Sequence, residues 1–114
     1  MVARAARRHA GPRVTWHVDY SAAVASRWEG AVDLVFIDGD HSEEGVRADW
    51  EDWHALVEPG GAVLFHDARL SQEGGRGLPG PTAAVDSLFR GPSAVAGWGV
   101  LREADRTVAV VRSP

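Results

Sequence analysis

Apolar side chains follow one another along this chain in the pattern of an alternating α/β protein. Val32 to Ile37 (VDLVFI) is a nearly continuous apolar run, and Ala62 to Phe65 is a second one. Strands that are apolar on both faces are typical of a parallel sheet covered by helices. The segment between the two runs has the length of a crossover helix, so the three elements predict a βαβ unit with a right-handed crossover.

The crossover segment carries the clearest helical pattern in the sequence. Its apolar residues recur at the spacing of one helix face: Val46, Trp50, Trp53 and Val57. Asp40 or Ser42 can cap the start of this helix, and Pro59-Gly60-Gly61 is expected to end it. Asp49 lies at the border of the apolar stripe, where we expect a solvated surface.

The flanking segments predict shorter elements that complete a single α/β domain over residues 1–114. They are a strand at Val14–Val18, a helix at Ser21–Trp28, a glycine- and proline-rich loop at Ser71–Pro81, a helix at Thr82–Phe89 capped by Thr82, and a hairpin of strands at Trp98–Leu101 and Thr107–Val111. Residues 1–9, rich in Arg and Ala, are expected to be the end of a helix.

Composition narrows the possible chemistry. The 114 residues include no cysteine, which excludes disulfides, a thiolate nucleophile and Cys-based zinc sites. All 12 basic residues are arginine, which excludes a catalytic lysine. A net charge of −4 argues against nucleic acid or an anionic membrane as the partner. No apolar run approaches ~18 residues and no signal peptide is visible, so we expect a cytoplasmic protein that does not span a membrane.

Polar residues gather where the predicted strands end. Asp19-Tyr20, Asp38-Gly39-Asp40-His41 and His66-Asp67 each follow a strand. Ligands of open parallel sheets bind beyond these ends, and neighbouring strands lie ~4.8 Å apart. Asp38 and Asp67 are therefore placed to share one hard cation. The alternative is that these aspartates only cap helices and turns.

Two further motifs bear on the function. His41, three residues after Asp38, is either a general base or a simple cap. Gly75–Gly80 matches the G-x-G-x-x-G pattern of dinucleotide-binding folds, but it does not directly follow a strand and a proline interrupts it. We interpret it as a flexible lid.

Residues 32–68, VDLVFIDGDHSEEGVRADWEDWHALVEPGGAVLFHDA, resemble a known family. The strand ending in D-G-D-H, the following E-G-V-x-x-D, the P-G-G turn and the strand ending in H-D are together similar to class I S-adenosylmethionine-dependent methyltransferases, particularly macrocin-type and other small-molecule O-methyltransferases. The resemblance implies a partial Rossmann-like sheet, mostly parallel with a C-terminal antiparallel hairpin. The strand order of the family is 3-2-1-4-5-7-6. No strand followed by a glycine-rich turn precedes residue 14, so the chain begins near strand three of this order and we expect an N-terminally incomplete domain that lacks the first two strands.

The resemblance also implies roles for individual residues. Asp38 and Asp67 match divalent-metal ligands, and His66 stands at a metal position that is often acidic. His41 matches the proposed base that takes the proton from the acceptor, a small-molecule hydroxyl. Asp19, with the neighbouring Tyr20, is expected to bind S-adenosylmethionine on its adenine side.

Without the glycine-rich loop after strand one, the chain is expected to bind S-adenosylmethionine weakly. Without strand one, Val32–Ile37 has a free edge, which either pairs with Val14–Val18 in a sheet of about five strands or mediates self-association.

Two other functions compete with that of an active methyltransferase. The first alternative is a non-catalytic remnant or partner-binding half-domain. The second takes Asp38-Gly39-Asp40 as the motif of a haloacid-dehalogenase-like phosphatase, which is ranked lower because the lysine of that family is absent.

Overall fold

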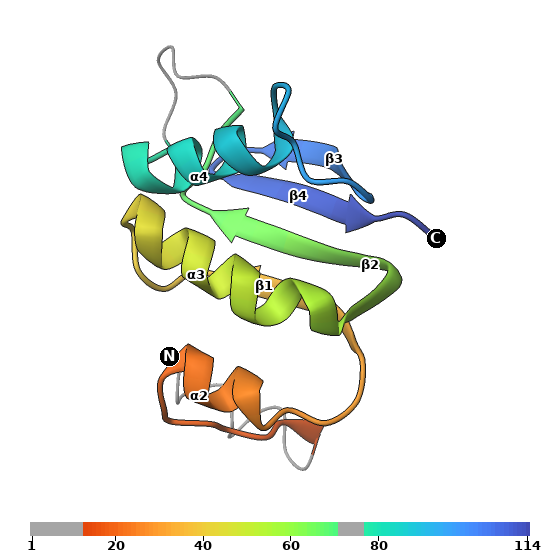
Figure 1. The fold of residues 1–114 in the computed structure, drawn as a ribbon. Coiled ribbons are helices and arrows are strands. Elements are labelled where there is room, and N and C mark those ends of the chain that lie inside the picture. Colours follow the sequence, from red (N-terminus) through yellow and green to blue (C-terminus); the bar gives the residue numbers. More distant parts are fainter. Residues whose placement is uncertain (1–12, 71–76) are drawn as a thin grey trace.

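The computed structural model describes residues 13–70 and 77–114. Four strands form one open sheet in the order β1-β2-β4-β3 (Figure 1). The elements are α2 (Ser21–Ser26), β1 (Val32–Ile37), α3 (Glu43–Trp53), the 3₁₀ turn η2 (His54–Leu56), β2 (Val57–His66), α4 (Pro79–Phe89), β3 (Trp98–Ala104) and β4 (Thr107–Arg112). None of these helices is long and apolar enough to cross a membrane.

The directions of the strands confirm the predicted fold class. β1 and β2 are parallel, whereas β4 is antiparallel to both of its neighbours, β2 and β3. Three strands therefore run one way and β4 runs the other. This arrangement is the order 4-5-7-6 that the resemblance implied, with the C-terminal hairpin in its expected place.

The core lies between the sheet and helices α3 and α4, which cover one face (Figure 1). Alternate residues of the strands point into it, because successive side chains of a strand face opposite ways. The buried cluster consists of Ile37, Val46, Trp50, Val57, Val63, Phe65, Ala68, Ala84, Val85, Leu88, Val108 and Val110. On the opposite face, Leu34 and Phe36 are 54% and 51% exposed.

Helix α3 starts where the sequence predicts and ends earlier. The Ser42 side chain caps it by accepting a hydrogen bond of 3.0 Å from the Gly45 N–H. The helix closes in η2, so that Val57 begins β2 and Pro59-Gly60-Gly61 lies within that strand rather than in a helix stop. Residues 58–61 of β2 stand opposite the single residue Asp33 of β1, and a Cβ on Gly61 would lie 2.7 Å from the Asp33 carbonyl oxygen. Glycine is therefore needed for this bulge. Because glycine is also typical of helix ends, the sequence wrongly predicted a helix stop here.

The predicted strand at Val14–Val18 is wrong. These residues are not in a strand, and within the described ranges β1 has no partner on its outer side. The expected pairing between Val14–Val18 and Val32–Ile37 is therefore wrong as well, and the sheet has four strands. Self-association through the free edge of β1 stays a prediction.

Helix α4 begins three residues before its predicted start. It starts at Pro79, because proline fits the first turn of a helix, where its missing N–H would have no helical partner. Thr82 is a buried residue inside the helix and not its cap; Leu78 holds the cap position. Pro79–Pro81 therefore belongs to α4 and not to the predicted loop. Residues 71–76 of that loop, and residues 1–9, where the end of a helix is expected, lie outside the described residues.

Candidate functional site

The carboxyl ends of β1 and β2 bring together the three predicted metal ligands. The parallel register pairs Phe36 with Leu64 and Ile37 with Phe65, so Asp38 and His66 come next on the two strands. Asp38 is two positions after Phe36, and His66 is two positions after Leu64. Because side chains two positions apart point to the same face of a sheet, both lie on the face that α3 and α4 do not cover. Asp38, His66 and Asp67 each offer one ligand atom, and these atoms lie within 4.8 Å of one another.

Asp67 is the buried centre of this group. It is 5% exposed and adopts φ = 58°, a left-handed conformation that aspartate tolerates better than most residues. Its carbonyl oxygen accepts a hydrogen bond of 2.7 Å from the Leu78 N–H, which fixes the chain just after β2. The carboxylate thus turns toward its neighbours: His41 Nε2 lies 3.2 Å from Oδ2, and His66 Nε2 lies 3.6 Å from Oδ1.

His41 is held by its backbone while its ring stays half-exposed. Asp40 Oδ1 accepts a hydrogen bond of 2.8 Å from the Ser42 N–H, and hydrogen bonds with Ser42 lower the pKa of the Asp40 carboxyl. From the other side, Gly80 at the start of α4 approaches so closely that a Cβ there would lie 2.0 Å from the His41 carbonyl oxygen. The loop between β1 and α3 is therefore held between the start of α3 and the start of α4. In this position the His41 ring contacts Asp67.

Arg106 completes the group, and sequence reasoning missed it. His66 pairs with Thr107, so the turn between β3 and β4 reaches the end of β2. The Arg106 carbonyl accepts a hydrogen bond of 3.2 Å from the Ala68 N–H, and Arg106 Nη2 lies 2.5 Å from Asp67 Oδ1. The side chain belongs to a hairpin turn almost 40 residues after Asp67, and no local pattern signals such a contact.

The donor set fits a divalent metal in spacing and in chemistry. Oxygen ligands bind Mg²⁺ or Ca²⁺ at ~2.1–2.5 Å, so two ligands of one ion lie no more than ~5 Å apart. The 4.8 Å limit on the three ligand atoms meets this condition. Two carboxylates with one imidazole suit Mn²⁺ or another transition metal better than Mg²⁺.

A cleft of about 650 Å³ adjoins Asp38, His66 and Asp67, the candidate metal-ligand group, along the free side of β1. Asp38 belongs both to the cleft wall and to the metal-ligand group. The other walls come from the segment before α2 and from α3, which contribute Asp19 and Asp49. The aromatic rings of Trp28 and Trp53 add apolar surface. The cleft therefore offers carboxylates and flat apolar surface to a ligand beside Asp38.

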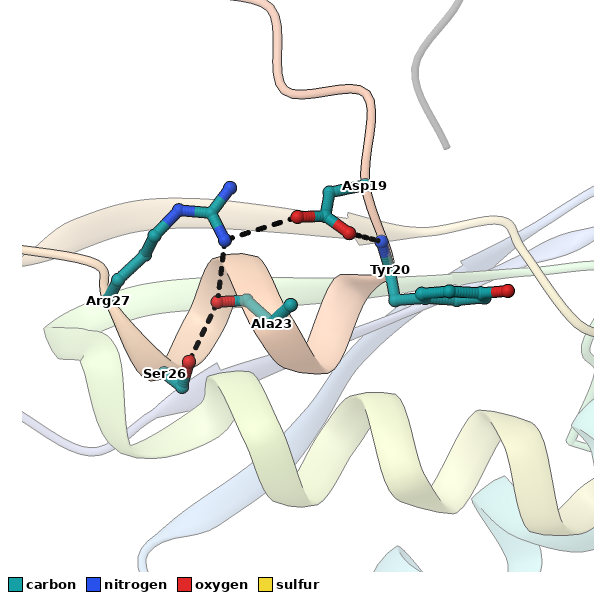
Figure 2. A network of polar contacts seen from close by, with 5 residues as sticks. All are labelled: Asp19, Tyr20, Ala23, Ser26 and Arg27. Atoms are coloured by element: carbon teal, nitrogen blue, oxygen red, sulfur yellow. Dashed lines mark hydrogen bonds and ion pairs between the residues drawn. The ribbon is translucent and has the colours of Figure 1, made fainter.

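Asp19 and Tyr20 are placed differently from each other (Figure 2). Asp19 lines the cleft, but its Oδ1 accepts a hydrogen bond of 2.7 Å from the Tyr20 N–H and its Oδ2 lies 3.3 Å from Arg27 Nη1. The Tyr20 side chain is 86% exposed and is not among the residues that line the cleft. The structure thus brings Asp19 to the cleft and leaves Tyr20 at its outside.

Asp49 is a second residue whose position the sequence did not reveal. It was expected on a solvated surface, yet it is partly buried in the cleft wall. Burial raises the pKa of its carboxyl, and a hydrogen bond with Ser21 lowers it by a smaller amount. Ser21 Oγ also accepts a hydrogen bond of 2.7 Å from Trp53 Nε1, which ties the start of α2 to α3. The border position of Asp49 on the apolar stripe was the available signal.

Asp49→Asn is expected to raise the melting temperature at pH 7. Because the pKa of Asp49 is higher in the folded chain than in the unfolded chain, this group favours folding below its unfolded pKa of 3.8, and that contribution is lost as the pH rises through the folded value. At pH 7 the charged carboxylate is a net cost, which asparagine removes. Thermal melts at pH 7 and pH 3 should show a difference only at the higher pH; a variant that is less stable at pH 7 would contradict this account.

Two comparisons with known proteins bear on the family of this chain. Residues 2–68, more than half of the chain, match the family described as "Methyltransferase domain". The chain is also 39% identical over 46 residues to "Uncharacterized protein y4gI" of Sinorhizobium fredii (strain NBRC 101917 / NGR234); this stretch is 40% of the chain and 5% of that protein. The chain therefore covers only a small part of the length of this relative. The match over residues 2–68 shows that the chain belongs to the methyltransferase domain family.

Proposed function

We propose that this domain takes part in the S-adenosylmethionine-dependent, metal-assisted methylation of a hydroxyl group on a small molecule. The observation that carries the proposal is the convergence of Asp38, His66, Asp67 and His41 at the ends of two adjacent parallel strands in a methyltransferase domain. A metal-ligand group and a histidine base side by side are the two parts that deprotonation of a hydroxyl requires.

In this proposal Asp38, His66 and Asp67 hold the metal. The metal would lower the pKa of the acceptor hydroxyl and orient it. His41 takes the proton. Its Nε2 faces Asp67 Oδ2 at 3.2 Å, so in the neutral tautomer with hydrogen on Nε2 the free lone pair is on Nδ1. Asp67 would thus hold the ring in the orientation in which Nδ1 acts as the base.

The cleft beside Asp38 is the proposed site of the methyl donor. Asp19, at the cleft wall, would accept a hydrogen bond from the adenine amine, and the aromatic side chains of Trp28 and Trp53 would contact the flat ring. Because Asp38 belongs to both the cleft and the metal-ligand group, donor and acceptor would meet at this residue. In this proposal a small-molecule hydroxyl would lie between the donor and His41.

Divalent metal is expected to stabilise the folded chain. A ligand that binds only the native state at ten times its dissociation constant adds about 1.4 kcal/mol, which raises the melting temperature by about 5 °C. Thermal melts with Mn²⁺, Zn²⁺ or Mg²⁺ should show this rise in the wild type and not in Asp38→Asn. Glu51→Gln, a matched charge removal at an exposed position of α3, should keep it. Identical melting curves with and without each metal would contradict the metal site.

A further inference from the structure

Asp67 is surrounded by positive or potentially positive groups, and these are divided between its two oxygens. His41 Nε2 approaches Oδ2, whereas Arg106 Nη2 and His66 Nε2 approach Oδ1 at 2.5 Å and 3.6 Å. A metal that bridges His66 and Asp67 would therefore use Oδ1, because that oxygen faces the His66 nitrogen. The same oxygen is already paired with the guanidinium of Arg106.

Charge leads to the same conclusion. Asp38 and Asp67 supply two negative charges to the metal-ligand group, and the positive charge of Arg106 offsets one of them. A unit positive charge next to a divalent ion repels it at any effective dielectric constant found in proteins. Arg106 is free to leave this place, since its side chain is 41% exposed and its buried Nε makes no hydrogen bond in the described part of the chain.

We infer that Arg106 and a divalent metal are alternative partners of Asp67 Oδ1, so that Arg106 sets how tightly this domain binds its metal. The inference rests on the metal site of the proposed function and adds a regulating residue to it. Without metal, Arg106 neutralises the buried carboxylate and keeps Oδ2 turned toward His41. Movement of the guanidinium toward solvent would free Oδ1, so that Asp67 could hold a metal together with Asp38 and His66.

The test is a titration of the 114-residue chain with Mn²⁺, in which electron paramagnetic resonance measures the free ion. Arg106→Gln should lower the dissociation constant by about tenfold or more, which is the repulsion expected between a unit charge and a divalent ion ~5 Å apart in water-like surroundings. Arg102→Gln removes the same charge from the exposed strand β3 of the same hairpin and should leave the dissociation constant within about twofold.

Two further variants keep the inference testable if Arg106→Gln does not fold, as judged by circular dichroism. Arg106→Met also removes the charge and keeps an apolar stem of similar length, so it should bind Mn²⁺ as tightly as Arg106→Gln. Arg106→Lys keeps the charge and should stay within about threefold of the wild type. Tenfold tighter binding by Arg106→Lys would overturn the competition, because the charge would then not be the cause.

The outcomes separate this inference from the proposed function. Equal or weaker Mn²⁺ binding in Arg106→Gln, with binding still lost in Asp38→Asn, overturns the competition and leaves the metal site in place. Absence of Mn²⁺ binding in every variant overturns the metal site and the competition together. Tighter binding in Arg106→Gln and Arg106→Met, with Arg102→Gln unchanged, supports the inference.

Discussion

His41→Ala is expected to lower the turnover number for methyl transfer by about 10²–10⁴-fold, the usual contribution of a general base. The ring of His41 lies next to Asp67, and its side chain is 52% exposed, so it can meet a substrate; imidazole is the side chain that most often serves as a general base. The residue does not line the cleft beside β1, so donor affinity should change little. Transfer of a radiolabelled methyl group from S-adenosylmethionine to a panel of hydroxylated small molecules measures the rate, and calorimetry measures donor affinity.

The matched control for this experiment is Glu44→Ala, which alters an exposed residue in the first turn of α3. It should leave both the turnover number and the donor affinity within about twofold of the wild type. A small effect of His41→Ala on turnover, or an equal loss in donor affinity, would argue against a base at this position and for the capping role that the sequence left open.

The convergence of Asp38, His66 and Asp67 was predictable from sequence because the positions of these residues follow simple geometry. A buried strand, a helix and a second buried strand place two strand ends side by side, and Asp38, His66 and Asp67 are the residues at those ends. His41 was predictable for the same reason, since it lies in the short loop between β1 and α3. Local pattern was sufficient here because each of these residues is within a few positions of an element with strong periodicity.

The failed predictions concern places where a local pattern depended on a distant neighbour. Val14–Val18 has the β-branched and aromatic composition of a strand, but a strand forms only where another pairs with its backbone groups, and β1 does not do so. Pro59-Gly60-Gly61 reads as a helix stop, yet close approach to Asp33 makes it a bulge within β2. Arg106 lies next to Asp67 because the register of β2 with β4 pairs His66 with Thr107, and no local pattern in the sequence gives that register.

Trp50→Ala is expected to be the most destabilising substitution in the chain. The side chain is 1% exposed, and its ring contacts four other rings: it stacks on His54 at 4.6 Å and meets Trp98, Phe89 and Phe65 at centroid distances of 4.8, 5.0 and 6.0 Å. These contacts join α3 to β2, α4 and β3. Removal of a buried tryptophan costs about 3–5 kcal/mol, against a total of about 5–15 kcal/mol for a domain.

We expect the melting temperature to fall by at least about 15 °C. We also expect partial unfolding at room temperature, because the core of such a small domain contributes little stability. Trp28→Ala is the matched control: Trp28 is 37% exposed and contacts only His17 and Trp53 among the described rings, so its loss should cost less than half as much. Calorimetric melts of both variants measure the difference. Because α3 begins directly after His41 and Ser42, collapse around Trp50 should also weaken Mn²⁺ binding, whereas Trp28→Ala should not. Equal melting temperatures for the two variants would show that the aromatic cluster around Trp50 does not hold α3, α4 and the sheet together.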